Sequence, residues 1–331
     1  MSALSSSRPL QILVGIIGVT LTLLLFIPEP LVELLWMQEL GYGDVFWKIL
    51  GTEVLLFAVV FIVALAFFGG NVYLLFRQIP PLWASQWAKE GEAPEMGGKP
   101  LTRQRLRRFA WGFAAVISLL FASGFAGRWD ELFRYSSGQA YGMTDPIFGI
   151  DISFYLLQLP LIQSLQSGLE GLAFLGLLVL VAAYVLIGEI AVQNGRLRVR
   201  PLVVKHLAAN VIVLLVGWAW GFYLDRFEVL MSGGGAVYGA GYTDVSVTLP
   251  ALWIMIAATL GLAAIVAYNL VSYQLRLLLY GVALYVVVLV GGLIAAPSIV
   301  NQVYVEPNEL QLEEPYLEHN IRFTREAYKL D

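Results

Sequence analysis

The sequence predicts an all-α integral membrane protein with about seven transmembrane helices. Hydrophobic residues make up 59% of the 331 residues, charged residues make up only 13%, and the mean hydropathy is +0.74. These values lie far from those of water-soluble domains. Windows of roughly 20 apolar residues, the length that crosses a bilayer as a helix, recur between short polar or Gly/Pro-rich breaks. The spans are expected near residues 9–28, 50–76, 109–127, 164–190, 206–224, 251–272 and 277–296.

The first predicted span is expected to stay attached to the protein. It runs through "LVGIIGVTLTLLLFIP" and is not followed by the small-residue site at which signal peptides are cleaved. The chain has no cysteine, so its chemistry cannot involve a thiol, a disulfide or a cysteine-bound metal. The first span is therefore interpreted as a signal anchor.

The distribution of charge predicts the orientation of the chain. Lys and Arg accumulate on the cytosolic side of spanning helices. With a cytosolic N-terminus, the inner segments hold 13 of the 20 basic residues, and the outer side carries 20 of the 24 acidic residues. We therefore expect a multi-pass protein of a bacterial cell membrane, with the N-terminus in the cytosol and the C-terminus outside.

Two predicted outer loops share a pattern. They read "WDELFRYSSGQAYGMTDP" and "LDRFEVLMSGGGAVYGAGYTDV" and align so that Asp145 falls on Asp244. The first outer loop holds a shorter version, "ELGYGDVFW", with Asp44. The three aspartates are 101 and 99 residues apart, which predicts three parallel helical-hairpin repeats of about 100 residues with a seventh helix outside the scheme.

The repeated aspartates admit two interpretations. Asp44, Asp145 and Asp244 would lie at equivalent depth on the outer face, where three carboxylates could bind a hard cation such as Ca²⁺. Each aspartate also precedes an apolar segment, and Asp145 is followed by Pro146, which is the pattern of a helix N-cap with proline at the first helical position. Capping is the preferred interpretation, and the cation site is the alternative.

The predicted spans contain few groups that could carry chemistry. Glu53 and Glu170 are placed near the outer boundary and Glu189 near the inner one, so none is expected in the middle of a span. The two histidines, His206 and His319, fall on opposite sides of the membrane in this topology. The polar interior residues are expected to form hydrogen bonds between helices; they are Asn71, Asn210, Thr259 and Asn269.

The chain is expected to consist of a transmembrane domain, residues 1–296, and the start of an extracytosolic region, residues 297–331. The second segment is polar and acidic but keeps four aromatic residues, which is unusual for a disordered tail. It is interpreted as the opening of an exported domain that this sequence does not complete.

Five segments together carry a family resemblance. They read "LGYGDVFW", "DPIFGIDISFYLLQLP", "YLDRFEVL", "GAGYTDV" and "PNELQLEEPYLEHNIRFTREAY". The chain resembles the bacterial uncharacterised protein family UPF0182 across essentially its whole length. The resemblance implies about seven N-terminal spans followed by a much larger extracytosolic region. It implies no biochemical activity and no catalytic residues.

Three classes of function remain open. The preferred one is a structural module that anchors an extracytosolic domain or serves as a subunit of a membrane complex, with membrane lipids and other membrane proteins as partners. A transporter or channel built from the hairpin repeats is the alternative. An envelope enzyme is the second alternative, with Asp130 and Asp225, or Asp145 and Asp244, as an acid/base pair. Neither a cofactor nor a catalytic residue is expected, and the basic segments beside the bilayer argue against nucleic-acid binding.

Overall fold

The computed structural model describes residues 28–78, 95–96, 99–100, 102–193, 196–233 and 238–330. The predicted span at 9–28 lies outside these residues, except for its last one. The chain divides into two compact units, one of residues 1–61 with 120–129 and the other of residues 62–119 with 130–331. The second, larger unit contains the candidate site.

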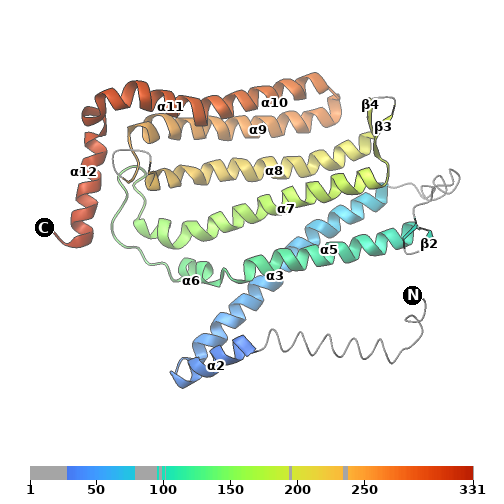
Figure 1. Cartoon of the computed structure of the whole chain (residues 1–331), viewed down its shortest axis with the longest axis horizontal. Helices are drawn as coiled ribbons and strands as arrows, with labels where there is room; N and C mark the ends of the chain where they lie inside the picture. The colour runs from blue at the N-terminus through green and yellow to red at the C-terminus, as the bar shows by residue number, and fades with distance from the viewer. Residues whose placement is uncertain are drawn as a thin grey trace. The chain divides into compact units, whose positions relative to one another are not determined.

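The described residues are mainly helical, and two short antiparallel hairpins are the exception (Figure 1). The hairpins pair β1 (Glu95–Met96) with β2 (Lys99–Pro100) and β3 (Ile190–Gln193) with β4 (Arg196–Val199). The helices are α2 (Pro28–Glu39), α3 (Gly43–Gln78), α5 (Arg103–Ala126), α6 (Trp129–Ser137), α7 (Leu159–Leu186), α8 (Pro201–Glu228), α9 (Leu249–Ser272), α10 (Leu275–Leu289), α11 (Ala296–Val300) and α12 (Glu309–Tyr328).

Six helical segments of the described residues are long and apolar enough to cross a membrane. The six predicted spans after the first each fall on one of them, so the prediction of a helical fold with several helices apolar enough for a membrane is confirmed. The total number of spans, the hairpin repeats and the role of a seventh helix stay predictions. The segments are Gly43–Arg77, Arg103–Ala126, Phe154–Leu186, Pro201–Met231, Asp244–Ser272 and Leu275–Tyr328.

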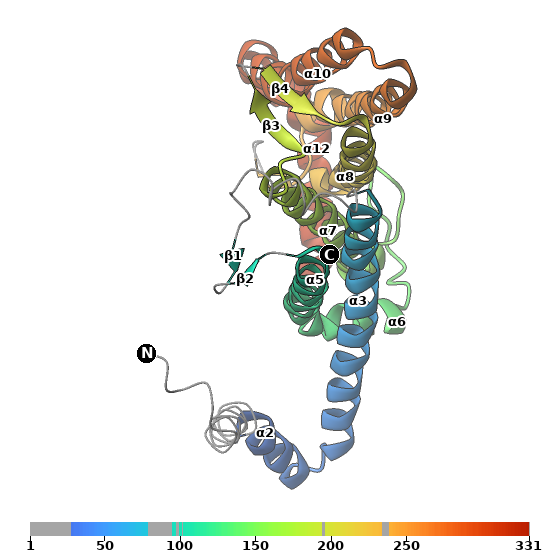
Figure 2. The same ribbon diagram turned by 90° about the vertical axis from the view of Figure 1, so that its right-hand side faces the viewer.

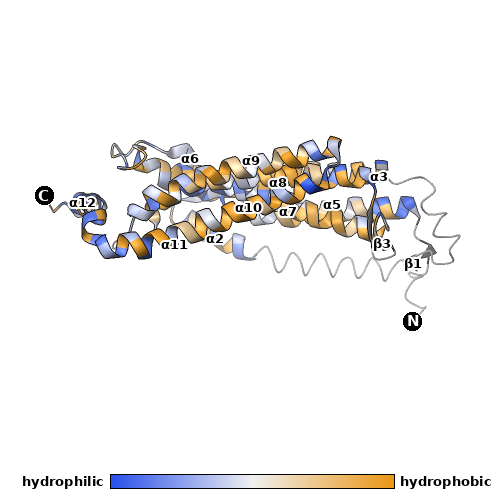
Figure 3. Cartoon of the chain, turned by 90° about the horizontal axis from the view of Figure 1, so that it is seen from above, coloured by the Kyte–Doolittle hydropathy of each residue, from blue (hydrophilic) through white to orange (hydrophobic). Residues whose placement is uncertain are grey.

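Helices α7 to α10 lie side by side in the larger unit (Figure 1), with α8 packed on α7 and α9, and α9 packed on α10. Apolar residues predominate along these four helices, whereas α12 is more polar (Figure 3). The β3–β4 hairpin joins α7 to α8 (Figure 2), and the long loops before α7 and α9 lie at the opposite end. We call these the hairpin end and the loop end of the unit.

Prolines shape the helices at the loop end. Each of the four π-helical segments in the described residues is followed by one residue and then a proline. Proline has no N–H and its ring collides with the preceding turn, so a wider turn is the local solution. The π-helical segments are Phe154–Gln158, Asp244–Thr248, Val290–Ala295 and Asn301–Val305.

The smaller unit contains the start of α3. Helix α2 ends in a turn in which Gly41 has a φ of 81°, and the N–H of Tyr42 donates to the carbonyl of Met37. This left-handed glycine closes the helix in the way common at helix C-termini. Asp44 then lies in the first turn of α3, where a negative charge is favourable.

Candidate functional site

The contact between α7 and α8, which we call the α7–α8 seam, carries polar side chains along its length. The two helices are antiparallel, so residues of α7 near the loop end face the last turns of α8. Polar and ionisable groups are expensive inside a bilayer, and those that occur there usually serve a function. The seam is therefore the candidate site.

A tight helix contact forms the middle of the seam. Gln166 is buried, and its Nε2 donates to the carbonyl oxygen of Gly217 at 3.1 Å. A Cβ added at Gly221 would lie 2.8 Å from Gln166 Nε2 and 3.4 Å from Glu170 Oε1, and a Cβ at Gly217 would lie 3.2 Å from Glu170 Cγ. The two glycines are four residues apart, the spacing that lets transmembrane helices approach closely. They make room for the polar side chains of α7.

Glu170 and Asp225 share a cavity of about 430 Å³, which we call the acidic cavity. Its other lining residues include Gln166, Trp218 and Tyr285, and none of the described lining residues is cationic. Arg226 follows Asp225 in the sequence, but its guanidinium lies over the Trp253 ring, 4.0 Å from the centroid. Among the described residues, the cavity therefore contains two carboxyl groups and no cationic side chain.

The position of Glu170 within its helix differs from its position within the predicted span. Glu170 is the midpoint of the 33-residue helical segment Phe154–Leu186, whereas it lies near the outer boundary of the shorter span predicted at 164–190. The helix continues outward beyond the predicted start at residue 164 because the π-helical turn Phe154–Gln158 and Pro160 extend it without a break. An ionisable group thus lies in the middle of a helical segment that is long and apolar enough to cross a membrane.

A second polar group lies nearer the hairpin end and joins three helices. We call it the imidazole cluster; it consists of Asn71 of α3, Tyr184 of α7, and His206 and Asn210 of α8. His206 Nε2 lies 2.9 Å from Asn71 Oδ1, and Asn210 Nδ2 donates to the same oxygen at 2.9 Å. Tyr184 Oη lies 2.8 Å from His206 Nδ1. Tyr184, His206 and Asn210 are all at least nine-tenths buried.

The hydrogen bonds assign the tautomer of neutral His206. Asn71 Nδ2 donates to the carbonyl of Phe67, so its Oδ1 faces His206 and can only accept. The proton is therefore on Nε2, and Nδ1 accepts from the Tyr184 hydroxyl. A further proton at Nδ1 would require the hydroxyl to turn and accept. The Oδ1 of Asn210 is buried and has no partner among the described residues.

Polar pairs close both ends of the seam. At the loop end, Gln163 Nε2 donates to Glu228 Oε1 at 2.8 Å. At the hairpin end, Arg200 and Glu189 form an ion pair at 2.8 Å. Polar groups are thus spaced from one end of α7 to the other.

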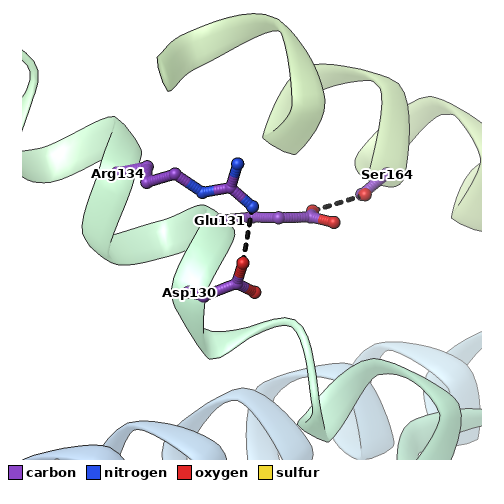
Figure 4. Close-up of polar contacts among 4 residues, drawn as sticks. All are labelled: Asp130, Glu131, Arg134 and Ser164. Carbon is purple, nitrogen blue, oxygen red and sulfur yellow. Dashed lines mark hydrogen bonds and ion pairs between the residues drawn. The ribbon is translucent and has the colours of Figure 1, made fainter. Parts of the chain in front are cut away.

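Helix α6 is attached to the loop end of α7. The Ser164 hydroxyl donates to Glu131, while Arg134 pairs with Asp130 one helical turn away (Figure 4). Asp130 is therefore engaged on its own helix, and Asp225 lies in the acidic cavity with Glu170. The structure does not bring together the acid/base pair Asp130 and Asp225.

Asp145 organises the loop before α7. Its carboxylate is buried and accepts four hydrogen bonds at 2.5 to 2.9 Å, from the N–H groups of Ile147, Phe148 and Ile150 and from the Tyr155 hydroxyl. These donors occupy the acceptor positions that a cation would need. The residues after Asp145 form a turn rather than a helix. Its assignment as a helix N-cap is therefore wrong, and the cation site stays a prediction that these hydrogen bonds do not favour.

Asp151 has the capping role instead. It directly precedes the helical turn that leads into α7 and accepts from the N–H groups of Ser153, Tyr141 and Gly142 at 2.8 to 2.9 Å. Hydrogen bonds from the Ser153 side chain and then from the Tyr141 N–H hold the pKa of the Asp151 carboxyl well below its ordinary value. Ionised Asp151 ties the loop to the start of α7.

The third aspartate lies beside α12. Gly241 N–H donates to Asp244 Oδ2 at 3.2 Å, and Glu313 of α12 accepts from the N–H of Tyr242 at 3.0 Å. A buried carboxylate from another helix thus caps the α9 helical segment. Asp44 belongs to the other unit. Among the described residues, three His, Asp or Glu side chains that could hold one metal ion are not found.

The predicted hydrogen bond between helices is confirmed for Asn71 and Asn210. The prediction is wrong for Thr259, which is fully buried and donates to the carbonyl of Met255 on its own helix. His206 and Tyr184 were not among the candidate residues predicted from the sequence, because His206 lies at the very start of the span predicted at 206–224. The spacing of His206 and Asn210, one helical turn apart, was the available signal.

Comparisons with known proteins give one consistent result. The family described as "Uncharacterised protein family (UPF0182)" matches residues 10–331. A UPF0182 protein of Salinibacter ruber is 59% identical over 330 residues, and one of Bradyrhizobium diazoefficiens is 35% identical over 326 residues. The alignments cover 100% and 96% of this chain but 35% of each relative, so the chain spans about a third of their length. No solved structure matches it.

Proposed function

The chain belongs to the uncharacterised protein family UPF0182, and we propose that it is a membrane domain that binds and carries protons along the α7–α8 seam. The observation that carries this proposal is the placement of Glu170 at the midpoint of a helical segment long and apolar enough to span a membrane, in a cavity that it shares with Asp225. Half-buried Glu170 and exposed Asp225 line this cavity together, and like charges that share a site favour the binding of a proton by one of them. A proton is the smallest cation that removes the conflict.

The imidazole cluster continues the path toward the hairpin end. Imidazole is the side chain best suited to exchange protons near neutral pH, and the Tyr184 hydroxyl can reverse its hydrogen bond when His206 gains a proton. Glu170 and Gly176, which lies beside Asn210, are six residues of α7 apart, or about 9 Å along the helix axis. Fully buried Ala173 lies between them in the sequence. A domain that translocates protons must open this stretch of α7 so that a proton can pass from Glu170 to the imidazole cluster.

Carbodiimide labelling tests whether Glu170 takes up a proton. Apolar carbodiimides react with protonated carboxyl groups, so mass spectrometry of the chain in detergent should find the adduct on Glu170 and find less of it as pH rises. Exposed Glu314 of α12 is the control residue. If sodium ions at constant pH protected Glu170 from labelling, the bound ligand would be a metal cation instead of a proton. Absence of labelling at Glu170 at every pH would also contradict the proposal.

A second candidate, the anchoring of an extracytosolic region, is supported by the attachment of α12. Besides the Glu313 contact, Asn320 Nδ2 donates to the carbonyl of Tyr238 at 2.8 Å. The matched relatives are about three times longer than this chain. The charge asymmetry of the sequence supports an extracytosolic loop end. A protease cleavage site fused after α12 should be cut only by protease added outside the cell. Cleavage by a protease in the cytosol would contradict this topology.

A further inference from the structure

A groove runs between α3, α5 and α7 at the hairpin end of the larger unit, apart from the acidic cavity. Its volume is about 290 Å³, and its walls are apolar side chains such as Leu75, Phe109 and Leu186. Asn71 contributes the one polar side chain among the described lining residues. The volume lies at the lower limit for a small-molecule site, so the groove has room for one hydrocarbon chain rather than a whole lipid.

The length of the groove matches one leaflet. Along α5 its lining extends from Leu106, in the first turn, to Ile117. Eleven residues of helix correspond to about 16 Å, and half of a hydrocarbon core of roughly 30 Å is roughly 15 Å. The groove thus begins where α5 begins and ends near the middle of the span. A lipid acyl chain has this length and chemistry.

Arginine lies at the mouth of the groove. Helix α5 begins with "RQRLRR", and Arg103 is three residues before Leu106 and seven before Ala110, on the face that lines the groove. Its Nη2 donates at 2.6 Å to the carbonyl of Phe76, which also lines the groove. Its Nε is buried and has no partner among the described residues. Arg103 is half-buried, and a guanidinium whose Nε–H is unused at such a position favours an acceptor beside it.

The other face of α5 offers a matched comparison. Arg108 shares that face with Gly112 and Ala115, which are four and seven residues further on and do not line the groove. It is exposed and belongs to the same basic run. A general attraction of the basic run to anionic lipid would involve both arginines alike, whereas a built site would involve Arg103 alone.

We propose that this groove binds one acyl chain of an anionic phospholipid whose phosphate group is bound by Arg103. The apolar walls fit a hydrocarbon chain, and the length of the groove fits one leaflet. The unpartnered Nε of Arg103 favours an anionic acceptor beside the helix end. The bound lipid would fill the space between α3, α5 and α7, and two of these helices, α3 and α7, carry members of the imidazole cluster. This inference does not depend on proton binding at Glu170.

Native mass spectrometry of the full chain tests the proposal, with detergent micelles that contain equal amounts of phosphatidylglycerol and phosphatidylcholine. The wild type and Arg108→Gln should retain phosphatidylglycerol. Arg103→Gln should lower the ratio of phosphatidylglycerol to phosphatidylcholine adducts about tenfold, the effect of losing a charge-assisted contact, and Arg103→Lys should restore part of it. Ala182→Phe, at an exposed position on the groove lining, should reduce retention of both lipids without unfolding the helices.

Three results would overturn the proposal. Equal losses in Arg103→Gln and Arg108→Gln would show a general electrostatic attraction instead of a site. Equal retention of the two lipids by the wild type would remove the role of the anionic group. Displacement of phosphatidylglycerol by glycerophosphoglycerol, which has the same head group without acyl chains, would show an anion site without a lipid groove. Circular dichroism of each variant distinguishes loss of binding from loss of the fold.

Discussion

The carboxylate of Asp145 is expected to be the most sensitive single group in the loops of the larger unit. Asp145→Ala would leave three backbone N–H groups and the Tyr155 hydroxyl without their acceptor. A buried donor that loses its partner costs about 1 to 3 kcal/mol. Water can reach part of this loop, so we expect a loss of about 3 to 5 kcal/mol, a large share of the roughly 5 to 15 kcal/mol that stabilises a typical domain.

Denaturant unfolding in mild detergent, followed by tryptophan fluorescence, measures this loss. Asp130→Ala is the matched control because Asp130 forms an exposed ion pair within one helix, which typically contributes less than about 1 kcal/mol. Asp145→Asn should be intermediate, since one amide oxygen can still accept from Ile147 and Phe148. If Asp145→Ala unfolded at the same denaturant concentration as Asp130→Ala, the carboxylate would not organise this loop.

Three further predictions concern the seam and its loop. Gly221→Ala places a methyl group 2.8 Å from the Gln166 amide nitrogen and should lower the unfolding midpoint, whereas Gly261→Ala, with open space at its Cβ, should raise or maintain it. Tyr184→Phe leaves the imidazole without its donor and should cost about 1 to 3 kcal/mol in the same assay. The pKa of Asp151 is lowered in the folded protein, so its stabilising effect is complete above its unfolded pKa of about 4 and is lost as pH falls further. The difference in free energy of unfolding between wild type and Asp151→Asn should therefore narrow below about pH 4. A difference that stays constant with pH would contradict this.

The sequence was sufficient to predict the six long apolar helices of the described residues, because the hydropathy of a window depends on its composition alone. The more polar helices α2, α6 and α12 were not predicted. The ends of the apolar helices were less predictable: α7 extends beyond its apolar window through Pro160 and a π-helical turn, and a hydropathy window detects only the hydrocarbon-spanning part. Glu170 is therefore the midpoint of its helical segment but lies near one end of its predicted span. The position of a charged residue along a helix cannot be judged without the length of that helix.

Contacts between distant residues were the least predictable part of the site. Asn71 and His206 are 135 residues apart, and nothing in the local pattern of either residue indicates the other. Two local signals were available, namely the glycines at 217 and 221 and the pair His206 and Asn210. For Asp145 the neighbouring proline suggested a helix start, but the left-handed Gly149, with a φ of 67°, marks a closed turn.

Proton flux through the reconstituted protein tests the central claim most directly. The chain is placed in liposomes that contain a pH-sensitive dye, and a potassium gradient with valinomycin sets the membrane potential. We expect acidification that requires the protein, falls at least about tenfold in Glu170→Gln and is unchanged in Glu314→Gln. Liposomes with folded wild-type protein that remain as proton-tight as empty liposomes, or equal flux in Glu170→Gln and wild type, would contradict the assignment of the seam as a proton path.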